Sequence, residues 1–117
     1  HDVEGHPQLG ASWEGFVIDQ ILQHLEATPG ESFFWRTHTG AELDLLVVRG
    51  RTRLGFEVKR TASPGITPSM RNAMRDLKLG SLTVVHAGKI SFPLARDIQA
   101  LSIADLPHRL KRLPTGR

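Results

Sequence analysis

The sequence predicts a single α/β domain, residues 1–117, in which a mixed β-sheet is flanked by helices. Three patterns carry this prediction: two alternating stretches joined as a hairpin within residues 40–61, a helical pattern before them, and a second helical pattern leading into a short apolar run. The hairpin strands must be antiparallel. A helix between the third and fourth strands permits a right-handed parallel crossover, so the sheet is expected to be mixed.

The composition of the chain excludes several kinds of site and of protein. The chain has no cysteine, which excludes disulfides, zinc–thiolate sites, iron–sulfur clusters and a thiol nucleophile. No apolar run approaches the roughly 18 residues of a membrane span, so we expect a cytoplasmic protein that does not enter a membrane. The net charge of +3 permits attraction to phosphate but is weak evidence for it. No phosphate-binding loop is present, so no ATP site is expected within this chain.

Residues 1–10 show little periodicity and are expected to form an irregular lead-in. Residues 11–27 have a helical pattern, ended by a Thr-Pro-Gly sequence. Glu14 projects into the apolar arc of this helix, where an unpaired carboxylate is costly. Two interpretations carry equal weight: a first-turn glutamate at the rim that favours the helix dipole, or a functional group. The apolar arc comprises Val17, Ile18, Ile21, Leu22 and Leu25.

Residues 31–37 are rich in aromatic side chains, which favours a first strand. In the hairpin that follows, alternation predicts one apolar face and places Asp44, Glu57 and Lys59 together on the opposite face. The apolar positions are Leu43, Leu45 and Val47 in one strand and Leu54, Phe56 and Val58 in the other.

The tip of the hairpin carries Arg49, Arg51 and Arg53. A solvated loop is the commoner explanation, about two to one, and a tip that contacts nucleic-acid phosphates is the alternative. Arg60, directly after the second strand, joins these three as a candidate nucleic-acid contact.

The C-terminal half predicts a helix over residues 67–79, closed by a glycine, and a buried strand over residues 82–86. His86 is expected to be a satisfied strand-end histidine rather than a ligand. Residues 88–117 are expected to form an appendage, with short edge strands at 90–94 and 98–101 and a terminal helix. Ser102 is the candidate N-cap of that helix.

The polar cluster of the hairpin matches the needs of a hard cation. Mg²⁺ takes oxygen ligands and keeps several waters, so Asp44, Glu57 and the backbone carbonyl of Val58 form a plausible partial shell. Lys59 then orients the attacking water or stabilises developing negative charge, and Glu14 completes the site as an outer ligand or the ligand of a second ion. From spacing alone, a simple ion pair between a carboxylate and Lys59 is equally favoured.

These residues resemble a known signature. Glu14 on the opening helix, Asp44 in GAELDLLV and Glu57-Val58-Lys59 are similar to the PD-(D/E)xK motif of restriction-endonuclease-like nucleases, whose core has the order α-β-β-β-α-β. The proline that precedes the aspartate in that signature is replaced by Leu43.

A closer resemblance covers about residues 6–113. HPQLGASWEGFV at 6–17, WRT at 35–37 and GAELD at 40–44 look like the C-terminal domain of a large group of prokaryotic ATPases, in which an AAA-type module precedes a domain of unsettled function.

The resemblance implies specific roles. Asp44 and Glu57 would be Mg²⁺ (or Mn²⁺) ligands, Lys59 the catalytic lysine and Glu14 the helical acidic residue. It implies DNA as the substrate and an ATPase module upstream in the same polypeptide, and it leaves an oligomer open. The alternative is a non-catalytic module that binds nucleic acid or a partner and regulates that ATPase. A domain used only for oligomer contacts is a third, less favoured possibility.

Overall fold

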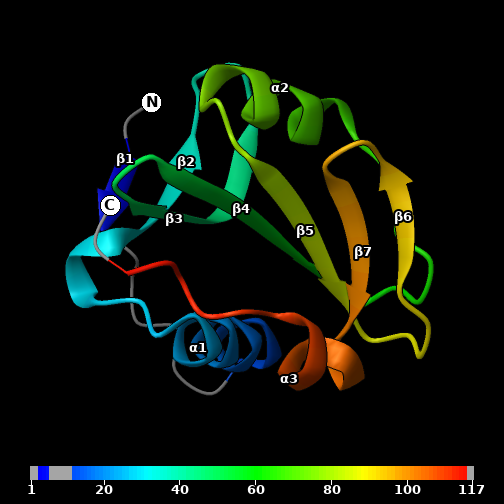
Figure 1. The fold of residues 1–117 in the computed structure, drawn as a ribbon. Coiled ribbons are helices and arrows are strands. Elements are labelled where there is room, and N and C mark those ends of the chain that lie inside the picture. The colour runs from blue at the N-terminus through cyan, green and yellow to red at the C-terminus, as the bar shows by residue number, and fades with distance from the viewer. Residues whose placement is uncertain (1–2, 6–11, 116–117) are drawn as a thin grey trace.

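A computed structural model describes residues 3–5 and 12–115, which form a mixed sheet with helices on both faces (Figure 1). The strand order in this part of the chain is β1-β2-β3-β4-β5-β7-β6. The predicted fold class is confirmed, and α1-β2-β3-β4-α2-β5 follows the predicted order of elements. The strands are β1 (Val3–Gly5), β2 (Ser32–Arg36), β3 (Glu42–Arg49), β4 (Thr52–Lys59), β5 (Ser81–His86), β6 (Phe92–Ala95) and β7 (Ile98–Ser102). The helices are α1 (Trp13–Leu25), α2 (Pro68–Asp76) and α3 (Leu106–Arg109), with 3₁₀ turns η1 (Pro29–Glu31) and η2 (Ile103–Asp105).

Helix α1 starts and stops where local chemistry dictates. The hydroxyl of Ser12 accepts a hydrogen bond from the backbone N–H of Gly15 at 2.9 Å, which caps the first turn. Glu26 adopts a left-handed conformation with φ 57° and ends the helix. The predicted helix over 11–27 is therefore confirmed, one turn shorter, although Ala11 lies outside the described residues.

Helix α2 connects the antiparallel and parallel parts of the sheet. Thr67 accepts a hydrogen bond from the N–H of Met70 at 3.2 Å, and Pro68 occupies the first turn, where its missing N–H costs nothing. The helix returns the chain so that β5 pairs with β4 in parallel, from Leu54–Ser81 to Lys59–His86. The predicted parallel crossover is confirmed.

Each face of the sheet is buried by a different helix (Figure 1). On one face α1, α3 and Leu113 pack against residues of β3, β4, β5 and β7, with Phe56 1% exposed at the centre. On the other face α2 packs Met70 and Ala73 against a second set of strand residues. Helices therefore cover both faces of the sheet.

Three predictions about the ends of the chain need correction. Residues 3–5 are not irregular but form β1, which pairs with β2; the other positions of the predicted lead-in lie outside the described residues. The strand predicted at 98–101 is not an edge: β7 lies between β5 and β6, and β6 is outermost. Ser102 caps the short turn η2, accepting from Ala104 N–H at 3.2 Å, and α3 is a single turn.

No helix within the described residues is long and apolar enough to cross a membrane.

Candidate active site

The candidate site lies where β3 separates from β4. The ladder between these strands runs from Arg49–Thr52 to Leu45–Phe56 and then stops, whereas β4 continues to pair with β5 as far as Lys59. On the other side of β3, between the pairs Phe33–Leu46 and Trp35–Leu43, one residue of β2 stands opposite two of β3. β3 therefore carries a β-bulge, and its extra residue falls at Asp44 and Leu45.

Because of the bulge, Leu43 lies on the face of the sheet opposite to the one predicted. Leu45 and Val47 pack on the α1 side as predicted, but Leu43 packs with Leu46 on the α2 side. Two-residue alternation placed Leu43 on the same face as Leu45, and a bulge breaks that alternation. The consequence is that Asp44 occupies the one irregular position of the strand.

Asp44 fills the gap that the strand separation opens. One of its carboxylate oxygens, Oδ2, accepts a hydrogen bond from the backbone N–H of Val58 at 2.8 Å. The side chain thus supplies the acceptor that a paired β3 backbone would otherwise provide. It is the N–H of Val58, not its carbonyl, that this contact uses, and the predicted role of the Val58 carbonyl stays a prediction.

Glu57 is buried beside Asp44. Its residue is 6% exposed, and burial together with the neighbouring Asp44 charge raises the pKa of Glu57 to about 9. The close approach of the Asp44 side chain raises the pKa of Glu57 further. The nearby Lys59 ammonium lowers the pKa of Glu57, but too little to offset burial. No ion pair within 4 Å links Glu57 to Lys59 among the described residues, so the simple ion-pair interpretation finds no support here.

Glu14 lies at the exposed first turn of α1 rather than within the apolar arc. The predicted projection into the apolar arc is therefore wrong, and the alternative of a first-turn glutamate at the rim describes its position. Its carboxyl nevertheless faces the cluster, because partial burial and then the Asp44 charge raise the pKa of Glu14. Glu14, Asp44 and Glu57 therefore form a row with Asp44 in the middle, and Lys59 acts on the pKa of both glutamates.

Arg60 is held beside this row by an aromatic side chain. Its guanidinium lies 5.1 Å from the ring centroid of Trp13, the residue before Glu14. Sequence reasoning named Arg60 but missed Trp13, since a half-buried tryptophan at a helix start is ordinarily read as core. The contact fixes an exposed cation at the mouth of the candidate site.

Of the three arginines at the hairpin tip, Arg49 and Arg53 form hydrogen bonds within the protein, whereas Arg51 is exposed. Arg49 donates to both carboxylate oxygens of Glu31, at 2.7 and 2.9 Å, and to the carbonyl oxygens of Glu26 and Pro114. Arg53 donates to the carbonyl of Leu77 at 2.6 Å. These contacts give Arg49 and Arg53 structural roles, which tie the hairpin to its neighbours. Arg51 is exposed, and its predicted contact with nucleic acid stays a prediction.

His86 is more deeply buried than expected of a strand-end histidine. It is fully buried at the end of β5, in register with Lys59 of β4, and its Nδ1 accepts from the N–H of Gly88 at 3.0 Å. Its Nε2 has no partner among the described residues, so the prediction of a satisfied histidine is half right.

The donor chemistry fits a small divalent cation held by two carboxylates. No group of three or more His, Asp and Glu side chains in the described ranges is placed to hold a metal ion. Mg²⁺ needs no such group, because it is commonly held by one or two carboxylates and keeps its waters. Asp44 and Glu57 bring two carboxyl groups together, and the Asp44 charge is, after burial, the second cause of the raised pKa of Glu57.

Comparison with known proteins places the chain in a family. The family model described as a domain of unknown function, DUF4143, matches residues 9–106. The chain belongs to this family. It is 46% identical over 99 residues to the uncharacterized proteins Rv2008c of Mycobacterium tuberculosis (strain ATCC 25618 / H37Rv) and Mb2031c of Mycobacterium bovis (strain ATCC BAA-935 / AF2122/97). The aligned region covers 85% of this chain but 22% of each relative, so the chain spans about a fifth of their length. No solved structure matches the chain.

Proposed function

We propose that this DUF4143 domain is a magnesium-dependent nuclease of the PD-(D/E)xK superfamily that hydrolyses DNA phosphodiester bonds. One observation carries the proposal: the buried Glu57 and the half-buried Asp44 lie together where β3 separates from β4, with Lys59 on the same strand as Glu57. A buried carboxyl beside a second carboxylate is costly for a structure that gains nothing from it, and strongly perturbed groups cluster at functional sites.

The side chains divide the work as follows. Asp44 and Glu57 would hold the ion, which when bound supplies positive charge to the phosphoryl oxygens and acidifies a water. The N–H of Val58 donates to Oδ2 of Asp44 and so fixes the orientation of this carboxylate. Lys59 places an ammonium close enough to affect Glu14 and Glu57, where it can donate to a phosphate oxygen. Glu14, exposed and with a raised pKa, is suited to exchange a proton with water at the rim.

Attachment to an AAA-type ATPase is part of the same proposal. It is supported by the resemblance of the chain to the C-terminal domain of such ATPases and by the size of its relatives, of which the matched region is 22%. A module of that kind would supply movement along or remodelling of DNA, while this domain cuts it.

Incubation with plasmid, linear and single-stranded DNA, with Mg²⁺ or Mn²⁺, tests the nuclease. We expect metal-dependent cleavage that falls by about a hundredfold or more in Asp44→Ala and in Lys59→Ala. Asp19→Asn, an equally simple change of an exposed carboxylate on α1, is the matched control and should cleave like the parent chain. Cleavage that survives in both cluster variants, or no cleavage by this chain and by a full-length relative of the family, refutes the proposal.

A non-catalytic module that binds nucleic acid is the second candidate. It is favoured by the exposed position of Glu14 and by the exposed arginines Arg51 and Arg60. DNA affinity that is independent of Asp44 and Glu57, with no cleavage under any metal, would select this candidate over the nuclease.

A further inference from the structure

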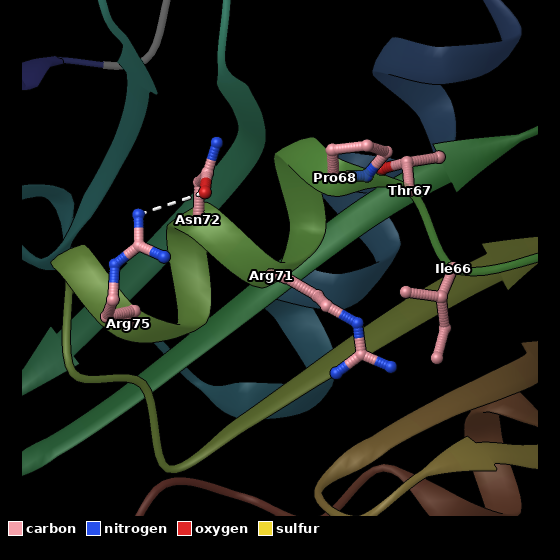
Figure 2. A pocket seen from close by; sticks show the side chains of 6 residues that line it. All are labelled: Ile66, Thr67, Pro68, Arg71, Asn72 and Arg75. Carbon is pink, nitrogen blue, oxygen red and sulfur yellow. Dashed lines mark hydrogen bonds between the residues drawn. The ribbon is translucent and has the colours of Figure 1, made fainter.

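Helix α2 carries two adjoining hollows on its exposed side, away from the carboxylate row. The first has a volume of about 460 Å³ (Figure 2), and the second a volume of about 270 Å³. Arg71 and Arg75 line both, so the hollows form one continuous groove, named here the α2 groove. Its lining also includes Ile66, Thr67, Pro68 and Asn72 at one end and Met74, Arg96 and Ile98 at the other.

The groove is cationic, and two of its three guanidiniums are available. Arg71 and Arg96 are exposed and form no hydrogen bond or ion pair with any residue of the described ranges. Figure 2 shows Arg71 extending from α2 toward Ile66, while Arg75 turns to Asn72, to which it donates at 2.9 Å.

Among the described residues, no carboxylate lines either hollow. Asp76 pairs with Arg75 at 3.0 Å from outside the lining, and Asp97, next to Arg96 in sequence, does not line the groove either. The groove thus keeps a net positive charge that nothing in its wall neutralises.

Helix α2 is hydrogen-bonded to the strand that carries Asp44. The hydroxyl of Ser69, in the first turn of α2, accepts from the N–H of Glu42 at 2.8 Å and donates to its carbonyl at 3.3 Å. Glu42 begins β3 two residues before Asp44, and its charge reaches Glu14. The other end of the helix contacts the beginning of β4, where Arg53 donates to the carbonyl of Leu77. The groove therefore leads away from the carboxylate row along the length of α2.

We propose that the α2 groove binds the sugar–phosphate backbone of the nucleic acid presented to Asp44 and Glu57, an inference that rests on the proposed nuclease function. From Thr67 to Arg75 the helix rises about 12 Å, which is the span of about three phosphates along one strand of B-form DNA. Guanidinium groups match phosphate oxygens in a two-pronged geometry, which a lysine does not reproduce. Contacts of this kind fix the position of the nucleic acid without reading its sequence.

Salt-dependent binding tests the groove separately from catalysis. The double variant Arg71→Gln/Arg96→Gln is compared with the parent chain by fluorescence anisotropy, using a short labelled DNA duplex in EDTA so that no cleavage occurs. If both arginines contact phosphates, the slope of log K against log salt becomes shallower by about 1.8 for duplex DNA. The matched control is Arg109→Gln/Lys111→Gln, which removes the same charge from exposed positions of the tail and should change the slope much less. Arg71→Lys/Arg96→Lys should keep the slope and lower affinity, because charge stays and the two-pronged contact is lost.

The outcomes separate the two proposals. A shallower slope in the glutamine variant than in the tail control supports the groove whether or not cleavage is found. An equal slope in the glutamine variant and the tail control overturns the groove, even if the domain cleaves DNA. Binding of polyglutamate that depends on Arg71 and Arg96, without binding of DNA, also overturns it, since the occupant is then an acidic peptide. Because Arg71 and Arg96 are exposed and unpaired with the described residues, we expect unchanged circular dichroism and melting temperature in the variants of these two arginines.

Discussion

Replacement of Glu57 by Gln isolates the energetic consequence of the buried carboxylate pair. In the folded chain the pKa of Glu57 is raised from 4.5 to about 9, first by burial and then by the Asp44 charge. Between these pH values the folded form keeps its proton while the unfolded form loses it. The stability that this carboxyl contributes is therefore complete below about pH 4.5 and is lost as pH rises toward about 9.

The size of the effect follows from linkage. Each pH unit in this interval lowers the free energy of unfolding by at most about 1.4 kcal/mol, so the change from pH 6 to pH 8 is at most about 2.7 kcal/mol. For a domain of this size the melting temperature would fall by up to about 10 °C. The figure is an upper bound, since water penetration and relaxation reduce the effective cost of a buried charge. Glu57→Gln keeps the shape and can still donate to Asp44, but it does not titrate, so its stability should be nearly flat across this range.

Urea or thermal unfolding at several pH values in EDTA provides the measurement. The difference between the parent chain and Glu57→Gln cancels the histidines, which titrate in both. Mg²⁺ should raise the melting temperature of the parent chain more at pH 8 than at pH 6, because ion and proton compete for the same oxygens, and should leave Glu57→Gln unchanged. A parent chain whose stability is flat or rises from pH 6 to pH 8, or a glutamine variant with the same slope, would refute the reasoning.

Two further predictions concern the stability of the fold: one tests two closely packed glycines, and the other tests the ion pair between Glu31 and Arg49. Gly88→Ala should destabilise the fold by about 1–3 kcal/mol in urea unfolding, because the added Cβ would lie 2.7 Å from the backbone carbonyl oxygen of Ala62. Gly55→Ala should cost less, since its close contact at 2.5 Å is the far end of a leucine side chain; an equal or larger loss there would contradict this distinction. Glu31→Gln should remove an acid transition: the Arg49 guanidinium lowers the pKa of Glu31 to about 2, so its contribution is present above about pH 4.5 and is lost toward pH 2. Acid unfolding profiles that coincide for parent and variant would exclude this role for the pair.

The sequence predicted the elements well because their signals are local. The apolar arc of α1 and the alternation of β4 depend on nearby residues, and both were confirmed. The short strand β1 was missed because three residues ending in glycine carry no periodic signal, and its pairing with β2 is a long-range contact.

The site was predicted by residue type and resemblance rather than by geometry. Alternation placed Asp44, Glu57 and Lys59 on one polar face, but both faces of the hairpin are buried by helices. The β-bulge that brings Asp44 to the N–H of Val58 depends on pairing with β2, which no local pattern reveals.

The sequence did not reveal which arginines have structural partners and which are available to bind a ligand. Three arginines in five residues suggested one basic tip, yet Arg49 and Arg53 are engaged by structural partners. The α2 groove has no compact signal in the sequence: Arg71 and Arg75 stand one helical turn apart, but Arg96 joins them only through the turn between β6 and β7.

Isothermal titration of the chain with Mg²⁺ or Mn²⁺ near pH 7, in buffers of different ionisation enthalpy, tests the central claim most directly. The Asp44–Glu57 pair should bind one ion and release close to one proton, because Glu57 with a pKa of about 9 is protonated before binding. Binding should vanish in Asp44→Asn and in Glu57→Gln and persist in Lys59→Ala. An absence of binding in the parent chain, or binding that both carboxylate variants retain, would contradict the claim that this pair is a metal site.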